Sequence, residues 1–230
     1  DDLKISSMKE LISPRELIEA LPMSRGAIDT VVQTRNEIIN ILNRTDKRFL
    51  LIVGPCSIHD IKAASEYAQR LLELKNKVKD NILVVMRVYF EKPRTVIGWK
   101  GLINDPDLDN SFNINKGIKI ARRLLIDLAE MGIPAGHEYL DLISPQYISD
   151  VICWGAIGAR TTESQSHREL ASGLSCPVGF KNGTDGGIQI AIDAIKAASK
   201  SHNFLSVTKE GKSAIFSTTG NQDCHVILRG

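Results

Sequence analysis

Apolar residues recur with the period of a helix in the first part of the chain, and this pattern changes near residue 48. Ser13, Pro14 and Glu16 match a capping box with proline in the first turn of a helix. A second helix is predicted over 24–44, where apolar positions again follow helical spacing. Residues 1–47 are therefore predicted to form a helical extension, with a role in oligomer formation or regulation.

From residue 48 onward, short apolar runs alternate with amphipathic helices. The runs at 48–56 and 82–90 are typical of strands buried on both faces, and helices are predicted over 61–78 and 114–131. Further strands are expected near 133–140, 152–160, 176–181 and 224–229, with helices near 145–151, 163–172 and 187–199. Residues 203–219 have the pattern of an inserted β-hairpin. Alternation of this kind predicts an α/β fold with a parallel sheet.

The connection after the first strand bears on the type of sheet. It lacks the Gly-x-Gly-x-x-Gly sequence of dinucleotide-binding folds, which favours a TIM (β/α)8 barrel over a doubly wound sheet. Six core strands are predicted over 48–230, whereas such a barrel has eight. We therefore expect either an incomplete barrel with about six of its eight strands or an open sheet.

Composition narrows the class of protein. The 230 residues are 43% hydrophobic and 24% charged with a net charge of +2, which is ordinary for a soluble globular protein and argues against a nucleic-acid partner. The longest apolar run, 49–53, is too short to span a membrane. No signal-peptide pattern opens the chain, and its four cysteines show no close pairing. These features predict a cytoplasmic protein with reduced thiols.

Candidate functional residues follow the predicted strands, because ligands of parallel α/β folds bind at the carboxyl ends of the strands. Reading these ends gives Cys56, Arg87, Lys92, Arg94, Glu138, Arg160, Lys181 and Arg229. Six of the eight are cations, which would repel one another unless anions lay between them. Arginine suits bidentate phosphate or carboxylate contacts, and lysine acts as a point charge. The sequence therefore predicts a site for small phosphorylated or carboxylated ligands.

Cys56 has three interpretations from the residues alone: a metal-binding thiolate, a nucleophile, or a small core residue. The core interpretation is favoured, because free cysteine is often buried and no Cys-x-x-Cys or His-x-x-x-His pair completes a metal site. Cys153, Cys176 and Cys224 are expected in the core as well.

Five longer motifs resemble one known family. They are GPCSIH at 54–59, RVYFEKPRT at 87–95, GWKGLIND at 98–105, GAIGARTTES at 155–164 and GFKNGTD at 179–185. The chain resembles, along its whole length, the type I, feedback-regulated 3-deoxy-D-arabino-heptulosonate 7-phosphate (DAHP) synthases. The resemblance implies a (β/α)8 barrel that condenses phosphoenolpyruvate with erythrose 4-phosphate, the first committed step of the shikimate pathway to aromatic amino acids. It also implies a divalent metal ion (Mn, Fe, Co or Zn) and a homodimer or homotetramer.

The resemblance assigns roles residue by residue. The phosphoenolpyruvate-binding residues would be Arg87, Lys92, Ala159, Arg160, Lys181 and Arg229. Arg94 and Thr95, in the sequence Lys-Pro-Arg-Thr that separates this family from the 3-deoxy-D-manno-octulosonate 8-phosphate synthases, would bind erythrose 4-phosphate. Lys92 and Glu138 would be catalytic, with Lys92 as general acid. Cys56 would be a metal ligand, which reverses the interpretation favoured from the residues alone.

The family completes its metal site with a histidine, a glutamate and an aspartate on the last two strands of the barrel and their loops, beyond position 230. A chain that ends at Gly230 is expected to lack a stable metal site and to have little or no activity. A chain that continues would supply those ligands. The first alternative function is therefore a non-catalytic phosphate-binding or regulatory remnant. Two further alternatives are an octulosonate synthase and a Schiff-base aldolase that uses Lys181.

The resemblance also implies a regulatory site for an aromatic amino acid, although the matching positions could be ordinary loop and hairpin residues. These positions are Asp2, Pro145, Gln146, Leu174, Ser175, Phe204 and Ser206. A serine at position 175 favours phenylalanine over tyrosine as the effector.

Overall fold

The computed structural model describes residues 2–228 and begins, after an extended segment, with two helices. Helix α1 (Pro14–Ala20) has both halves of the predicted capping box, since Ser13 and Glu16 bond reciprocally through side chains and backbone. Helix α2 (Arg25–Leu42) begins after Ser24, whose side chain accepts from the Ala27 amide. Both helices therefore form where the caps and the spacing predicted them.

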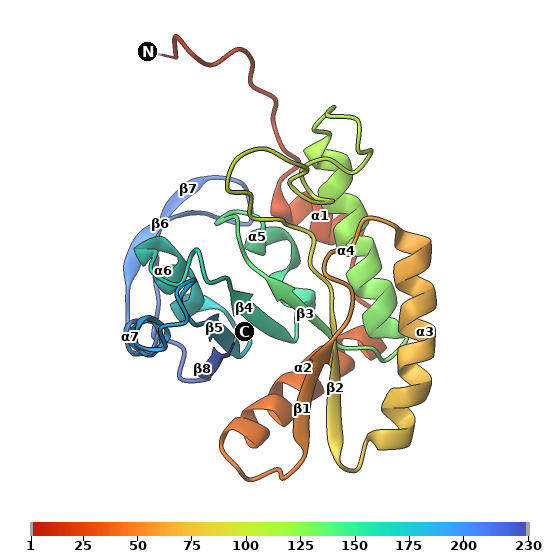
Figure 1. The fold of residues 1–230 in the computed structure, drawn as a ribbon. Coiled ribbons are helices and arrows are strands. Elements are labelled where there is room, and N and C mark those ends of the chain that lie inside the picture. The colour runs from red at the N-terminus through yellow and green to blue at the C-terminus, as the bar shows by residue number, and fades with distance from the viewer. Residues whose placement is uncertain (1, 229–230) are drawn as a thin grey trace.

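The core of the molecule is a six-stranded parallel sheet that curls into a half-barrel of the (β/α)8 type (Figure 1). The strand order is β1-β2-β3-β4-β5-β8. The bounds are β1 (Phe49–Val53), β2 (Ile82–Arg87), β3 (Ala135–Glu138), β4 (Trp154–Ile157), β5 (Val178–Lys181) and β8 (Cys224–Ile227). All five pairings are parallel, so the carboxyl ends of the strands meet at one edge.

Helices cover the outer face of this sheet. They are α3 (Ile61–Val78), α4 (Ile114–Glu130), α5 (Pro145–Ile148), α6 (Gln165–Gly173) and α7 (Gln189–Ala198), with a 3-10 turn, η1 (Ser149–Val151), after α5. Among the helices of residues 2–228, α4 has the largest number of buried residues, and these include Leu124, Leu125 and Leu128. It ends before Gly132, whose φ of 82° lies in the left-handed region that glycine tolerates at a helix end.

One prediction about the first strand is wrong. Strand β1 is not buried on both faces: Phe49 is 68% exposed, and the rest of the strand is half-buried. The reason is its position, because β1 pairs only with β2 within the described part of the chain and so lies at the edge of the sheet. Strand β2 matches the prediction, with four fully buried residues in its middle.

The predicted β-hairpin forms a separate two-stranded antiparallel sheet of β6 (Asn203–Val207) and β7 (Ser213–Ser217). The hairpin lies between α7 and β8 in the chain, and within residues 2–228 it does not pair with the six-stranded sheet. In Figure 1 it runs past α6 on the outside of the molecule. The cavity formed beside it is described below.

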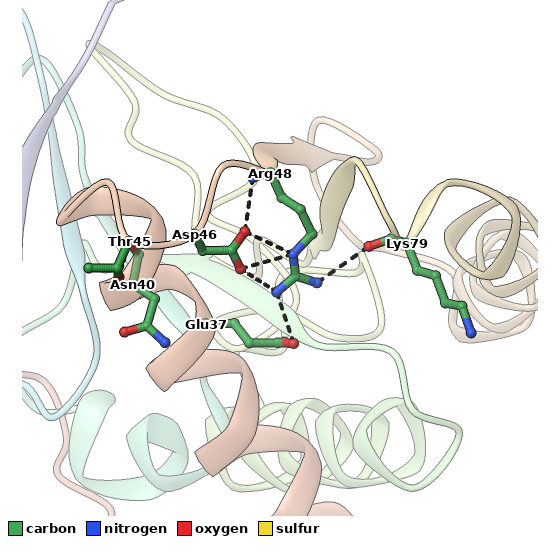
Figure 2. A network of polar contacts seen from close by, with 6 residues as sticks. All are labelled: Glu37, Asn40, Thr45, Asp46, Arg48 and Lys79. Carbon is green, nitrogen blue, oxygen red and sulfur yellow. Dashed lines mark hydrogen bonds and ion pairs between the residues drawn. The ribbon is translucent and has the colours of Figure 1, made fainter.

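A polar network joins α2 to the amino-terminal ends of β1 and β2 (Figure 2). The Arg48 guanidinium donates to Asp46 Oδ2 at 2.6 Å, to Glu37 Oε1 at 3.0 Å and to the Lys79 carbonyl at 3.4 Å. The two carboxylates hold the pKa of Arg48 above its ordinary value. With its donors used in this way, Arg48 fixes the start of β1 and is not free to bind a ligand.

No helix in residues 2–228 combines the length and the apolar character that crossing a membrane would require.

Candidate active site and regulatory cavity

The carboxyl ends of the strands surround a cavity of about 480 Å³, which we call the strand-end cavity. Its walls include five of the eight candidate residues that the sequence placed at the strand ends. They are Cys56, Arg87, Glu138, Arg160 and Lys181, with Ala159 beside them. These residues come from β1, β2, β3, β4 and β5 or the loops that follow, so the parallel topology brings them together.

Cys56 lies in the loop after β1 and is exposed, so the core interpretation is wrong. The run of apolar residues stops being a strand at Val53, and Cys56 follows three residues later, outside the core. Lys92 Nζ donates to Cys56 Sγ at 3.2 Å. This hydrogen bond and the charge of Lys92 lower the pKa of the Cys56 thiol, which favours the thiolate.

Arg87 at the end of β2 is held by an aromatic ring. Its guanidinium carbon lies 3.9 Å from the centroid of the Tyr89 ring, which is within the range of a cation–π contact. Its Nη2 donates to the Cys56 carbonyl at 3.2 Å, whereas its buried Nε has no hydrogen-bond partner among residues 2–228. The stack on Tyr89 therefore orients a guanidinium that has few polar contacts. Burial raises the pKa of Tyr89, so its ring stays neutral beneath the cation.

Glu138 at the end of β3 forms an ion pair with Lys181 at the end of β5. The Lys181 Nζ also lies 5.5 Å from the Tyr89 ring centroid. The carbonyl of Lys181 accepts from Thr162 Oγ1 at 2.7 Å, which ties the end of β5 to the loop after β4. A carboxylate and an ammonium group thus face the same cavity as Arg87.

The remaining predicted substrate residues lie elsewhere. Arg94 and Thr95 are exposed in the loop after β2 and do not line the strand-end cavity. Arg94 Nε donates to the Trp99 carbonyl at 2.7 Å, and the Lys92 amide donates to the Lys100 carbonyl at 2.9 Å, so this loop folds back on itself. Arg229 lies outside the described residues.

The balance of charge shows what the strand-end cavity can do. Arg87, Arg160 and Lys181 supply three cations to its wall, and Glu138 offsets one of them. Lys92 adds a fourth cation beside the cavity, where it contacts Cys56. Arg160 is exposed and has no hydrogen bond or ion pair in the described part of the chain. Such a surplus of positive charge on rigid strand ends is suited to a small ligand that carries phosphate and carboxylate groups.

A metal ion was also expected at Cys56. Across residues 2–228, no three His, Cys, Asp or Glu side chains come close enough to hold one. The Cys56 sulfur has the Lys92 ammonium group beside it, at 3.2 Å. The described residues therefore supply one candidate ligand and do not by themselves fit a divalent metal ion.

A second cavity, of about 550 Å³, lies between α5, α6 and the β-hairpin, and we call it the hairpin cavity. Six of the seven predicted regulatory residues line it, namely Pro145, Gln146, Leu174, Ser175, Phe204 and Ser206. Lys209 reaches into its wall and donates to the Gln146 carbonyl, and burial lowers the pKa of Lys209. Asp2 lies in the extended N-terminal segment and does not line this cavity.

Sequence reasoning missed two residues next to the strand-end cavity, Tyr89 and Glu91. Alternate residues of an extended chain point to one side, so the spacing of Arg87 and Tyr89 could have indicated their stack. Glu91 gave no such signal. It lies in the sequence between the candidate residues Arg87 and Lys92, but its hydrogen-bond partners are about 50 residues away along the chain.

Comparisons with known proteins agree with the resemblance. The family model of the DAHP synthetase I family matches residues 27–230. The chain is 63% identical over its whole length to the Phe-sensitive phospho-2-dehydro-3-deoxyheptonate aldolase of Escherichia coli strain K12, of which it covers 66%. It is 54% identical to the Trp-sensitive protein of that name from the same strain, and 58% identical to the Haemophilus influenzae protein.

A solved structure gives the same result at the level of the fold. The phospho-2-dehydro-3-deoxyheptonate aldolase of Francisella tularensis SCHU S4 superposes with a TM-score of 0.97 at 58% identity. The match covers 98% of this chain and 66% of the Francisella chain. The chain thus spans about two thirds of the length of the relatives it matches.

Proposed function

This chain belongs to the DAHP synthetase I family, and on that premise we propose that it carries the substrate-binding part of a DAHP synthase. The reaction would join phosphoenolpyruvate to erythrose 4-phosphate and release inorganic phosphate. The observation that carries the proposal is that Arg87, Arg160 and Lys181 line one cavity. Lys92 lies beside this cavity and donates a hydrogen bond to Cys56, which also lines it. The names of the Escherichia coli and Haemophilus relatives support the same reaction.

Phosphoenolpyruvate would bind in the strand-end cavity through its two anionic groups. Arg87 and Arg160 are suited to bidentate contacts with phosphate or carboxylate oxygens, and Lys92 and Lys181 add point charges. The Ala159 amide lies in the same wall and can donate to a phosphate oxygen. Arg229 is assigned to the same ligand, and Arg94 and Thr95 to the phosphate of erythrose 4-phosphate.

The reaction then needs proton transfers at each step, which the side chains can supply. C3 of phosphoenolpyruvate attacks the aldehyde carbon of erythrose 4-phosphate, and Lys92 gives its proton to the oxygen that becomes an alkoxide. Water adds at C2 and passes a proton to Glu138, which gives a hemiketal phosphate. The bond from C2 to the phosphate oxygen then breaks: Glu138 passes its proton to the leaving phosphate, and the C2 hydroxyl gives its proton to Lys92. These transfers release inorganic phosphate, leave the ketone and restore both side chains. The cations stabilise the charge on both phosphates throughout.

The family implies a divalent metal ion, and Cys56 is the candidate ligand that this chain offers. The proton transfers described above take place between side chains and substrate.

Direct binding tests the site. We expect the chain to bind phosphoenolpyruvate in isothermal titration calorimetry, and Arg160→Ala to weaken that binding by about tenfold or more, as loss of a charge-assisted contact does. Because Arg160 has no partner in the described residues, its loss should leave the fold intact. Arg70→Ala is the matched control, since Arg70 is exposed on α3 and pairs with Glu66. A wild-type chain that binds no phosphoenolpyruvate would refute the proposal.

Turnover separates the alternatives. The assay measures release of inorganic phosphate from phosphoenolpyruvate with a divalent metal ion supplied. Release with erythrose 4-phosphate as the second substrate would support a DAHP synthase, whereas release with arabinose 5-phosphate but not with erythrose 4-phosphate would indicate an octulosonate synthase. Binding without turnover would support the non-catalytic alternative. In an active protein, Lys92→Met is expected to abolish turnover while its circular dichroism spectrum stays unchanged.

We infer that the hairpin cavity is the regulatory site and that it binds an aromatic amino acid, phenylalanine in preference to tyrosine. Support comes from the Phe-sensitive relative at 63% identity and from Ser175 and Phe204 in the cavity wall. We also propose that the protein is a cytoplasmic homodimer or homotetramer to which residues 1–47 contribute. Calorimetry with phenylalanine and tyrosine would test the preference, and tighter binding of tyrosine would contradict it.

A further inference from the structure

Glu91 is a buried carboxylate in the loop that carries Lys92, and only 3% of it is exposed. Its oxygens accept from two backbone amides, those of Leu140 at 3.4 Å and Asp141 at 3.2 Å. Ser144 Oγ donates to it at 3.2 Å. All three donors belong to the loop after β3, so Glu91 joins the β2 loop to the β3 loop through its side chain alone.

A fourth partner of Glu91 comes from inside the sheet. His137 Nδ1 lies 2.9 Å from the Val88 carbonyl, which can only accept, so Nδ1 carries a hydrogen. His137 Nε2 lies 3.3 Å from Glu91 Oε2, which places the imidazole ring against the Glu91 side chain. Glu91 is therefore anchored to β3 as well as to the loop that follows it.

The β3 loop leads directly to the hairpin cavity. Asp141 Oδ1 accepts from the Ile143 and Ser144 amides at 2.6 and 2.9 Å, which shapes the turn before α5. Helix α5 begins at the next residue, Pro145, and both Pro145 and Gln146 line the hairpin cavity. One covalent step thus separates a donor to Glu91 from the wall of the hairpin cavity.

We propose that Glu91 is the positioning residue that couples the hairpin cavity to Lys92, which lies beside the strand-end cavity against Cys56. The inference rests on the proposed function, since it assigns a regulatory route to the same two cavities. A ligand that moves Pro145 and Gln146 displaces Ser144, and Glu91 and its neighbour Lys92 move with it. The physical reason is that a buried carboxylate cannot lose its donors without the cost of an unpaired charge, so the two loops shift together.

Linkage between two ligands measures this coupling. In the wild-type chain we expect saturating phenylalanine to weaken phosphoenolpyruvate binding by about fivefold or more, the lower end of common allosteric coupling. In Glu91→Ala the same comparison should give a change of less than about twofold, although each ligand still binds alone. Glu91→Gln should be intermediate, because an amide can donate to His137 and accept from Asp141 but repels the Leu140 amide.

Two further variants keep the test decisive. Ser144→Ala removes one donor from Glu91 and takes the place of Glu91→Ala if that variant fails to fold; it too should reduce the coupling. Glu66→Ala is the control, because Glu66 is exposed on α3 and pairs with Arg70 on the same helix. Unchanged coupling in Glu91→Ala, or in Ser144→Ala in its place, would overturn the proposal.

Hydrogen exchange separates failure of this inference from failure of the proposed function. In the ligand-free chain, Glu91→Ala should speed amide exchange in residues 91–97 and in residues 139–148 together. Faster exchange in only one of these segments overturns the inference, whatever the chain binds. If the wild-type chain binds phosphoenolpyruvate but phenylalanine does not alter that binding, the coupling is refuted and the anion site still holds. If it binds no phosphoenolpyruvate, the proposed function fails, and exchange alone decides whether Glu91 joins the loops.

Discussion

Charged residues in the strand-end cavity differ in how many partners they have, and this decides which of them can meet a ligand. Lys181 is paired with Glu138, and Arg87 is stacked on Tyr89, whereas Arg160 is exposed. A paired or stacked cation is oriented before the ligand arrives, which reduces the entropy lost on binding. Arg160 adds charge without orientation, so its contribution depends on the ligand.

Lys92 and Cys56 can be examined without any substrate. Because Lys92 stabilises the thiolate, the alkylation rate of Cys56 by iodoacetamide should reach half its maximum at a pH below about 8.5, the ordinary value for a cysteine thiol. Lys92→Met removes the cation, so the pKa should rise and the whole pH profile should move to higher pH. Mass spectrometry of the alkylated peptide measures this, and Cys56→Ser should abolish the signal. An unmoved profile in Lys92→Met would show that the cation does not act on the thiol.

Tyr89 is expected to act through its ring and not through its hydroxyl. Tyr89→Leu should weaken phosphoenolpyruvate binding by about 2- to 30-fold, which corresponds to a cation–π contact of about 0.5–2 kcal/mol with Arg87. Tyr89→Phe keeps the ring and should bind as the wild type does. Calorimetry on the two variants distinguishes the roles, and equal losses in both would exclude the stacking explanation.

At the scale of elements, helices followed the sequence more closely than the first strand did. Caps and helical spacing predicted α1, α3 and α4 within a few residues, because local hydrogen bonds and one buried face define a helix end. The exposure of β1 was not predictable in this way, because an apolar run looks the same whether its neighbours cover one side or two.

The packing of α4 gives a prediction at this scale. A Cβ on Gly117 would lie 2.1 Å from the Ile103 carbonyl oxygen, so Gly117→Ala should force the helix away from the loop after β2 and lower the free energy of unfolding by about 1–3 kcal/mol. Gly26→Ala in α2 is the matched control, because its Cβ would meet nothing closer than Ser24 Oγ at 4.0 Å. That variant should be more stable than the wild type by about 0.4–1 kcal/mol. Urea unfolding compares them, and a Gly117→Ala variant as stable as Gly26→Ala would contradict the close approach.

At the scale of the whole molecule, the parallel sheet was predictable and so were most residues of its functional edge. The rule that parallel strands present their carboxyl ends together placed Arg87, Glu138 and Lys181 in one cavity. The partners of Glu91 were not predictable, because loops distant in sequence meet only after the sheet has formed. The environment of Cys56 was missed for a related reason, since its lysine comes from a different strand end.

The remaining thiols test the integrity of this core. Cys153 and Cys176 are buried as expected, whereas Cys224, on the last strand of the sheet, is half-buried. Burial raises the pKa of Cys176 to about 11 and the pKa values of Cys153 and Cys224 to about 12. At pH 8 the folded chain should therefore show one thiol that reacts quickly with a disulfide reagent, Cys56, and all four of its cysteines should react in denaturant. Absorbance of the released thiolate gives the count. Several fast thiols under native conditions would mean that the sheet opens readily.

The β-hairpin has a consequence for how such proteins diverge. It lies between α7 and β8, and in residues 2–228 its two strands pair with each other and not with the six-stranded sheet. Residues can therefore be exchanged or added within it while the register of the six-stranded sheet is preserved. Phe204 and Ser206 belong to this hairpin and line its cavity, whereas Arg87, Glu138 and Lys181 lie on strands of the sheet and line the strand-end cavity. The lining of the hairpin cavity can therefore vary among related chains while the strand ends keep their side chains.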